Sequence, residues 1–160
     1  MGDFYSRQEL IAARAAWKQQ DRRVVFTNGC YDILHPGHIR LLEQARSLGD
    51  VLILALNSDA SVARLKGPKR PLIGEGERAE LALRLEAVDA VTLFDEDTPR
   101  ELIAAVLPDI LVKGADWSHF VAGREEVEAA GGEVRLIPLE KGYSTTATVE
   151  EIVARRRGDC

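Results

Sequence analysis

Two histidines separated by two residues, His35 and His38, are the most chemically informative feature of the sequence. Between them lie Pro36 and Gly37, and proline favours the first position of a helix because no N–H is needed there. His35 is therefore expected at or near the N-cap and His38 in the first turn, on one side of the helix mouth. The unpaired N–H groups and the positive helix end point the same way, and Gly37 lets a ligand approach the backbone. This pattern predicts a polyphosphate site.

Other interpretations of this segment stay open. The histidines could be ordinary surface or hydrogen-bonded residues, or Asp32, His35 and His38 could bind a metal, although His119 is remote in sequence and no further ligand is obvious. Cys30 fits a small core thiol better than a nucleophile. Neither a G-x-G-x-x-G fingerprint nor a P-loop occurs at this turn, which argues against nicotinamide and flavin cofactors.

The elements that position these residues alternate between strands and helices. Apolar runs predict five strands at Val24–Phe26, Val51–Leu56, Ala90–Phe94, Ile110–Val112 and Val134–Ile137. Helical spacing predicts helices at Ser6–Gln20, from Pro36 until Gly49, at Gly76–Val88, Thr98–Val106, Gly123–Ala130 and Ser144–Arg156, with a short helical turn at Ser61–Leu65. The alternation favours an α/β, Rossmann-like three-layer fold with a five-stranded parallel sheet. We expect a single domain over residues 1–160, with an N-terminal helix at about 6–20 and a core at about 22–156.

Polar groups gather where the predicted strands end, which is where ligands bind in open parallel sheets. Lys66, Lys69 and Arg70 form a basic cluster after the second strand. Ser144 and Thr145 open the last helix, where their hydroxyls could simply cap the helix or could meet a phosphate at a second positive helix end.

The composition is that of a globular protein. The chain has 160 residues, of which 46% are hydrophobic and 29% charged, which suits one core. Its longest apolar run, Val51–Leu56, is far too short to span a membrane, and Cys30 and Cys160 are too few for a disulfide framework. A net charge of -5 argues against a general nucleic-acid binder. No signal peptide is visible, so we expect a cytoplasmic protein with neither nucleic acid nor membrane as a partner.

Several segments match, in order, the cytidylyltransferase-like branch of the H-x-G-H nucleotidyltransferase superfamily. They are Thr27-Asn28-Gly29-Cys30-Tyr31-Asp32, His35–His38, Asn57–Val62 with Leu65–Pro68, Val112–Trp117 and Gly142–Thr146. Over about residues 20–155 the chain resembles the D-glycero-D-manno-heptose 1-phosphate adenylyltransferases, the ADP-heptose synthase type. In many bacteria such a domain is fused behind a sugar kinase, and the resemblance here is to the stand-alone form.

The resemblance implies transfer of AMP from ATP to the sugar 1-phosphate, by direct in-line attack on the α-phosphate. The catalytic residues it implies are His35, His38 and Lys66. The nucleotide-binding residues would be Thr27, Asn28, Gly29, Cys30, Gly37, Lys113, Gly114, Tyr143, Ser144, Thr145 and Thr146. The substrate-binding residues would be Asp32, Asn57, Asp59, Arg78 and Asp116, although an exposed helix arginine fits Arg78 nearly as well and a turn carboxylate fits Asp32. Mg2+ would arrive with ATP and needs no dedicated protein ligand. The partners implied are ATP and the sugar 1-phosphate, and the implied assembly is a homodimer.

One departure from the branch pattern is Ala147, where a basic residue usually follows the two threonines. Two other functions fit the same motifs. The first is a cytidylyltransferase acting on glycerol 3-phosphate, or a GDP-heptose-forming guanylyltransferase. The second is a non-catalytic nucleotide-binding module, against which the full set of His35, His38, Lys66 and Ser144 argues.

Overall fold

Six parallel strands form one sheet in the computed structural model, which describes residues 1–115, 119–139 and 141–158. The strands are β1 (Asp3–Phe4), β2 (Val24–Gly29), β3 (Val51–Asn57), β4 (Ala90–Phe94), β5 (Ile110–Gly114) and β6 (Glu133–Ile137). Their order is β1-β4-β3-β2-β5-β6, and every neighbouring pair is parallel. The chain leads from β2 to β3 and β4 on one side and from β5 to β6 on the other. The switch point between β2 and β5 is therefore where this kind of sheet binds ligands.

The prediction of a five-stranded sheet is wrong by one strand, because β1 adds to the edge of β4. Asp3 pairs with Ala90 and Phe4 with Val91, and the N–H of Asp3 donates to the carbonyl of Asp89 at 3.0 Å. A strand of two exposed residues carries no hydrophobic period, so only its pairing defines it. The five predicted strands are confirmed: β4 has the predicted bounds, and the other four are longer than predicted by one to three residues.

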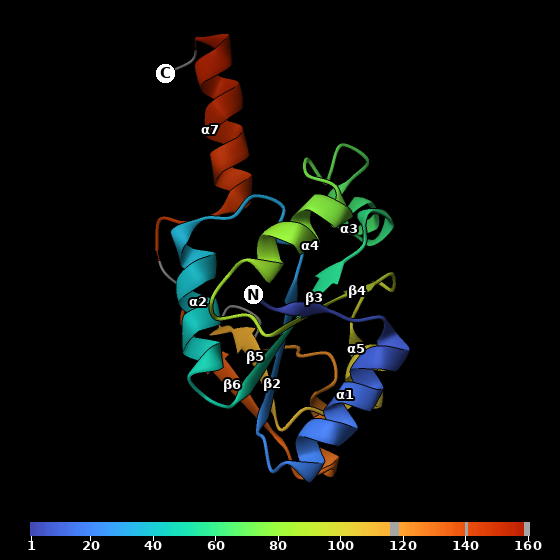
Figure 1. Ribbon diagram of the computed structural model, residues 1–160. Helices are drawn as coiled ribbons and strands as arrows, with labels where there is room; N and C mark the ends of the chain where they lie inside the picture. The colour runs from blue at the N-terminus through green and yellow to red at the C-terminus, as the bar shows by residue number, and fades with distance from the viewer. Residues whose placement is uncertain (116–118, 140, 159–160) are drawn as a thin grey trace.

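Helices cover both faces of the sheet and make the three predicted layers (Figure 1). They are α1 (Arg7–Gln19), α2 (Pro36–Arg46), α3 (Asp59–Lys66), α4 (Glu75–Leu83), α5 (Arg100–Val106), α6 (Arg124–Ala129) and α7 (Thr145–Arg157). Each predicted helix is present. The helix expected to reach Val88 ends earlier, at Leu83, and the short turn expected at Ser61–Leu65 is the longer helix α3.

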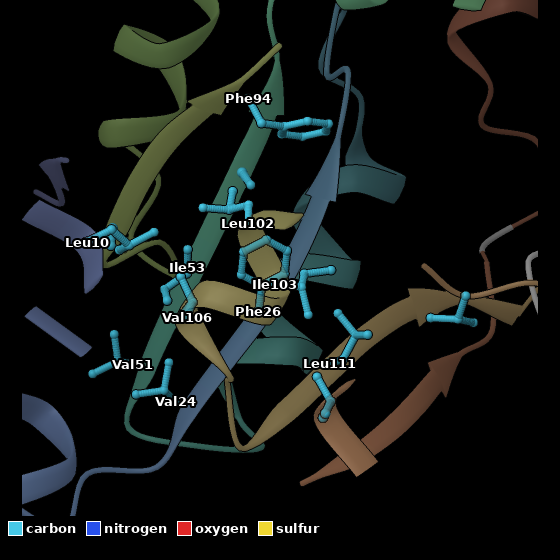
Figure 2. Close-up of a cluster of buried hydrophobic side chains, with 14 residues drawn as sticks. Leu10, Val24, Phe26, Val51, Ile53, Phe94, Leu102, Ile103, Val106 and Leu111 are labelled. Atoms are coloured by element: carbon cyan, nitrogen blue, oxygen red, sulfur yellow. The ribbon is translucent and has the colours of Figure 1, made fainter. Parts of the chain in front are cut away.

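Two apolar clusters fix the sheet from its two sides. Figure 2 shows the first cluster, in which α1, α5 and α6 pack on the sheet through residues that include Leu10, Phe26, Ile53, Leu102 and Leu111. On the opposite face, α2 and α4 pack on residues of the same strands, among them Leu52 and Leu54. All seven residues of β3 are buried, as expected of a parallel strand covered on both faces. Packing on both faces thus holds the ends of the central strands in fixed positions.

Helix α7 differs from the other helices in its packing. It projects away from the body of the molecule (Figure 1), and none of its described residues is buried. Its C-terminal half exposes Ile152 and Val153. In the described part of the chain, no helix combines the length and the apolar character needed to cross a lipid bilayer.

Candidate nucleotide-binding site

A cleft of about 500 Å³ lies at the carboxyl ends of β2, β3 and β5. Predicted site residues from all five matched segments of the sequence line it together: Thr27, Asn28, Gly29, Cys30, Asp32, His38, Asn57, Lys66, Lys113, Gly114 and Thr145. The parallel topology explains this gathering, because it brings the strand ends and the loops that follow them to one edge.

The two histidines cap helix α2 reciprocally. The N–H of His38 donates to Nδ1 of His35 at 3.3 Å, and the N–H of His35 donates to Nδ1 of His38 at 3.2 Å. The rings stack with their centroids 3.7 Å apart and their planes 12° apart. Because each Nδ1 accepts a hydrogen bond, the proton of each neutral ring is assigned to Nε2. Nε2–H of His38, which lines the cleft, is therefore a donor suited to a phosphate oxygen.

Both histidines are held in the neutral form. Burial first, and then the proximity of His35 and Lys66, lower the pKa of His38 from 6.5 to about 4. Burial also lowers the pKa of His35. At neutral pH the pair can thus donate hydrogen bonds without carrying charge. Lys66 lines the same cleft as His38.

Gly37 and Tyr143 bring the start of α7 against the start of α2. A Cβ on Gly37 would lie 3.0 Å from Cε1 and Nδ1 of His35 and 3.1 Å from Cβ of Tyr143, so an added side chain would displace these neighbours by a few tenths of an ångström. The Tyr143 ring stacks on His35 with centroids 5.6 Å apart. Thr145 Oγ1 donates to the carbonyl of Ile33 at 3.1 Å, and Ser144 caps α7 by accepting from the N–H of Ala147.

These contacts place the remaining nucleotide-binding predictions around the cleft rather than on its walls. Gly37, Tyr143, Ser144 and Thr146 lie at the facing starts of α2 and α7, outside the lining of the cleft. His35 likewise lies beside His38 rather than on the lining. Their contacts with a nucleotide stay a prediction.

Asp32 fastens the loop of residues 67–74 to the histidine turn. Its carboxylate accepts hydrogen bonds from Arg70 Nε at 2.7 Å and from the N–H groups of Leu72 and Ile73 at 2.9 and 2.8 Å. Burial alone would raise the pKa of Asp32, but these N–H groups and the Arg70 guanidinium hold it below its usual value. Asp32 is thus ionised and fully engaged within the protein.

Arg78 connects the same loop to the residues at the ends of β2 and β3. Its side chain is 0% exposed, so the alternative of an exposed helix arginine is wrong. The guanidinium donates to the carbonyls of Cys30, Asn57 and Ile73 at 2.7, 2.8 and 2.9 Å, and pairs with Asp59 at 2.8 Å. These contacts give Arg78 a positioning role. Direct contact of these predicted substrate-binding side chains with a substrate stays a prediction.

The lining also contains residues that the sequence did not single out as site residues, namely Tyr31, Leu41, Leu65, Arg70, Asp97, Thr98, Pro99, Phe120, Ala122 and Leu139. Of these, Tyr31 and Leu65 lie within matched motifs, and Arg70 belongs to the basic cluster after the second strand. Asp97, Thr98 and Pro99 follow β4, so the rule that ligands bind beyond strand ends could have indicated them. Phe120 and Leu139 come from segments with no motif. The predicted substrate residue Asp116, with Trp117, lies outside the described residues.

The chemistry of the cleft suits phosphate better than a resident metal. Its donors include the Nε2–H of His38, Lys66 and Arg70, and the carboxylate of Asp32 is used by protein groups. Within residues 1–115, 119–139 and 141–158, no three His, Cys, Asp or Glu side chains are grouped to hold a metal ion. Mg2+ fits this site as part of a nucleotide, coordinated by phosphate oxygens and water.

Comparisons with known proteins agree on one family. The cytidylyltransferase-like family profile matches residues 26–151. The bifunctional protein HldE of Koribacter versatilis is 53% identical over 147 residues, which cover 91% of this chain and 30% of that protein. HldE of Trichlorobacter lovleyi is 55% identical over 151 residues, covering 94% and 31%. The chain therefore spans less than a third of the length of these curated relatives.

Two solved structures share the fold. A lipopolysaccharide core biosynthesis protein from Thermoplasma volcanium is 32% identical, with a TM-score of 0.61, over 77% of this chain and 99% of that one. A pantoate-β-alanine ligase from Francisella tularensis has a TM-score of 0.65 at 13% identity, over 88% and 68% of the two chains, and shows similarity of fold alone. With the family profile spanning most of its length and a structural relative matched almost end to end, the chain belongs to the cytidylyltransferase-like family of nucleotidyltransferases.

Proposed function

We propose that the chain transfers AMP from ATP to D-glycero-D-manno-heptose 1-phosphate, giving ADP-heptose and pyrophosphate. The observation that carries this proposal is the pair of neutral, reciprocally capping histidines at the start of α2, with His38 and Lys66 on the cleft. The motif resemblance to heptose 1-phosphate adenylyltransferases supports the acceptor. The similarity to a lipopolysaccharide core biosynthesis protein supports the same choice.

In the proposed reaction, a phosphate oxygen of the sugar 1-phosphate attacks the α-phosphorus of ATP. The bond from the α-phosphorus to the oxygen that bridges to the β-phosphate breaks on the opposite side, and pyrophosphate leaves with that electron pair. No covalent enzyme intermediate is needed, so catalysis consists of positioning and charge stabilisation. His38 and His35 donate from Nε2 to phosphate oxygens, and Lys66 adds a mobile positive charge. Mg2+ enters with ATP as part of the substrate.

The surroundings of the reaction follow from the same proposal. ATP and a sugar 1-phosphate are the small-molecule partners, and the cytoplasm, where ATP is supplied, is the proposed compartment. The homodimer implied by the family resemblance stays a prediction, which light scattering of the purified chain would test.

The test is pyrophosphate release from ATP, CTP, GTP and UTP, each combined with heptose 1-phosphate and with glycerol 3-phosphate. We expect ATP with heptose 1-phosphate to give the highest kcat/KM. Release that requires CTP and glycerol 3-phosphate would replace this proposal with a polyol-phosphate cytidylyltransferase. If no pair gives release, the chain is a binding module.

The histidine role has its own test. His38→Ala should lower kcat by about 10²- to 10³-fold, as removal of one well-placed donor commonly does. Gln44→Ala, an exposed change on the same helix, is the matched control and should leave kcat unchanged. A folded His38→Ala protein with near wild-type turnover would remove His38 from the mechanism.

A further inference from the structure

Arg70 places an unsatisfied positive group in the cleft. Its side chain is only 12% exposed, and Nε is engaged by Asp32 at 2.7 Å. Nη2 is buried and has no hydrogen-bond partner among the described residues, although Arg70 lines the cleft. A buried donor without an acceptor is unfavourable, and native proteins rarely keep one without a reason. An acceptor that enters with a ligand would supply this reason.

The charges around Arg70 favour an anionic ligand. Asp32 is the carboxylate that faces Arg70, and its oxygens already accept from Arg70 and from the N–H groups of Leu72 and Ile73. Lys66 lines the same side of the cleft. Asp97 also lines the cleft, but its carboxylate pairs with Arg64 at 2.8 Å. Lys66 therefore adds positive charge on the β3 side of the cleft, while Arg70, whose charge is balanced by Asp32, adds a hydrogen-bond donor, and Asp97 is balanced by Arg64.

The position of Arg70 separates it from the expected nucleotide side. The second half of the cleft, beyond β2, is formed by Gly114 at the end of β5 and by Thr145 at the start of α7. The histidine turn follows β2, between the two halves. An in-line reaction brings two phosphate groups together from opposite directions. The cationic β3 side is thus the natural place for the phosphate that is not part of ATP.

We propose that Arg70 Nη2 donates to a phosphate oxygen of the acceptor and thereby selects a phosphate monoester as the acceptor. This inference rests on the proposed function, because it assigns one substrate of that reaction to one side of its cleft. Asp32 orients the guanidinium by holding Nε, which leaves Nη2 to meet the acceptor phosphate. Arginine suits this task because its planar fork can bond a carboxylate and a phosphate at once.

The kinetic test compares Arg70→Lys and Arg70→Gln with Lys69→Gln, which removes an exposed cation from the same loop. Loss of a hydrogen bond to a charged group should raise the KM for heptose 1-phosphate about 10- to 100-fold in both Arg70 variants. The KM for ATP should change less than about twofold, and Lys69→Gln should leave both values near wild type. An unchanged acceptor KM would overturn the inference. So would equal increases in both KM values together with a lower Tm, because they would show that Arg70 acts only by holding the loop.

A binding test separates this inference from the proposed function. Calorimetric titration of heptose 1-phosphate into protein saturated with a non-hydrolysable ATP analogue requires no turnover. Binding by the wild type that is lost in Arg70→Gln supports the inference, even if the wild type proves inactive and the proposed function fails. Equal binding by the wild type and both Arg70 variants, or no binding by the wild type, overturns the inference. Arg70→Lys keeps the test informative if Arg70→Gln does not fold.

Discussion

Helices α2 and α7 both begin beside the cleft, yet the protein supports them very differently. Helix α2 buries Leu42 and Ala45 against the sheet, and its first turn is locked by two histidine side chains. Helix α7 has no buried residue, and its start is attached through Thr145 and through the Tyr143 ring. The N-terminus of α2 is therefore held more firmly beside the cleft than the N-terminus of α7. We expect α2 to govern the rate and α7 to govern nucleotide affinity.

Among the changes that compare the two helices, the largest effect is expected from crowding the start of α2. Gly37→Ala places a methyl group 3.0 Å from the His35 ring and 3.1 Å from Tyr143. These neighbours must shift by a few tenths of an ångström. Because a misplacement of about 1 Å can cost about 10²-fold in rate, we expect kcat to fall by up to that factor. Steady-state pyrophosphate release measures this change.

Gly76→Ala in α4 is the matched control for Gly37→Ala. An added Cβ there meets nothing within 4 Å, so this change should leave kcat unaltered and stabilise α4 slightly. An unaffected kcat in Gly37→Ala would show that the histidine pair tolerates displacement and would remove the proposed difference between the two helices.

A smaller effect should follow from loosening α7. Thr145→Val removes the hydrogen bond to the Ile33 carbonyl and keeps the shape of the side chain. A lost hydrogen bond of about 1 kcal/mol corresponds to roughly a fivefold higher KM for ATP, with little change in kcat. Thr148→Val, one turn further from the cleft, is the control. A fall in kcat with an unchanged KM would reverse the roles assigned to α2 and α7.

The smallest effect on activity is expected from a change of pH, and it should come from protonation of His38 on α2. The pKa of His38 is about 4 in the folded protein, lowered from 6.5, so the ring should stay neutral at pH 5.5. The unfolded chain binds more protons between these values, so this contribution to stability is present above pH 6.5 and is lost as the pH falls toward 4. Proton NMR of the His38 ring measures its pKa, and urea unfolding at several pH values measures the change in the free energy of unfolding. A ring that titrates near 6.5 would contradict the neutral pair.

Much of the fold could be predicted from the sequence because its signals are local. Buried parallel strands such as β3 are continuous apolar runs, and the Pro36 signal fixed the start of α2 to the residue. Strand β1 could not be predicted, since Asp3 and Phe4 are extended only because β4 offers its edge. Strand β1 is defined by pairing with residues that are far away in the sequence, and a local sequence pattern does not reveal such pairing.

The candidate site likewise has features that the local sequence predicts and features that depend on contacts between distant residues. The motif around His35 and His38 predicted that both residues stand at the start of α2, but not that each imidazole accepts the other residue's N–H. The position of Arg78 on α4 suggested an ordinary surface arginine as readily as a ligand. Its burial follows from the carbonyls of Cys30 and Asn57, which lie 48 and 21 residues away along the chain. Contacts at such separations leave no local pattern.

The loop of residues 67–74 has a consequence for how such proteins diversify. It connects α3 to α4 outside the sheet, and Asp32 and Arg78 anchor it largely through its main-chain atoms. Main-chain anchoring tolerates exchange of the side chains it holds in place. Under the proposed function, the side chains of this segment other than Arg70 can vary during evolution and change which acceptor is bound, while the histidine turn stays unchanged.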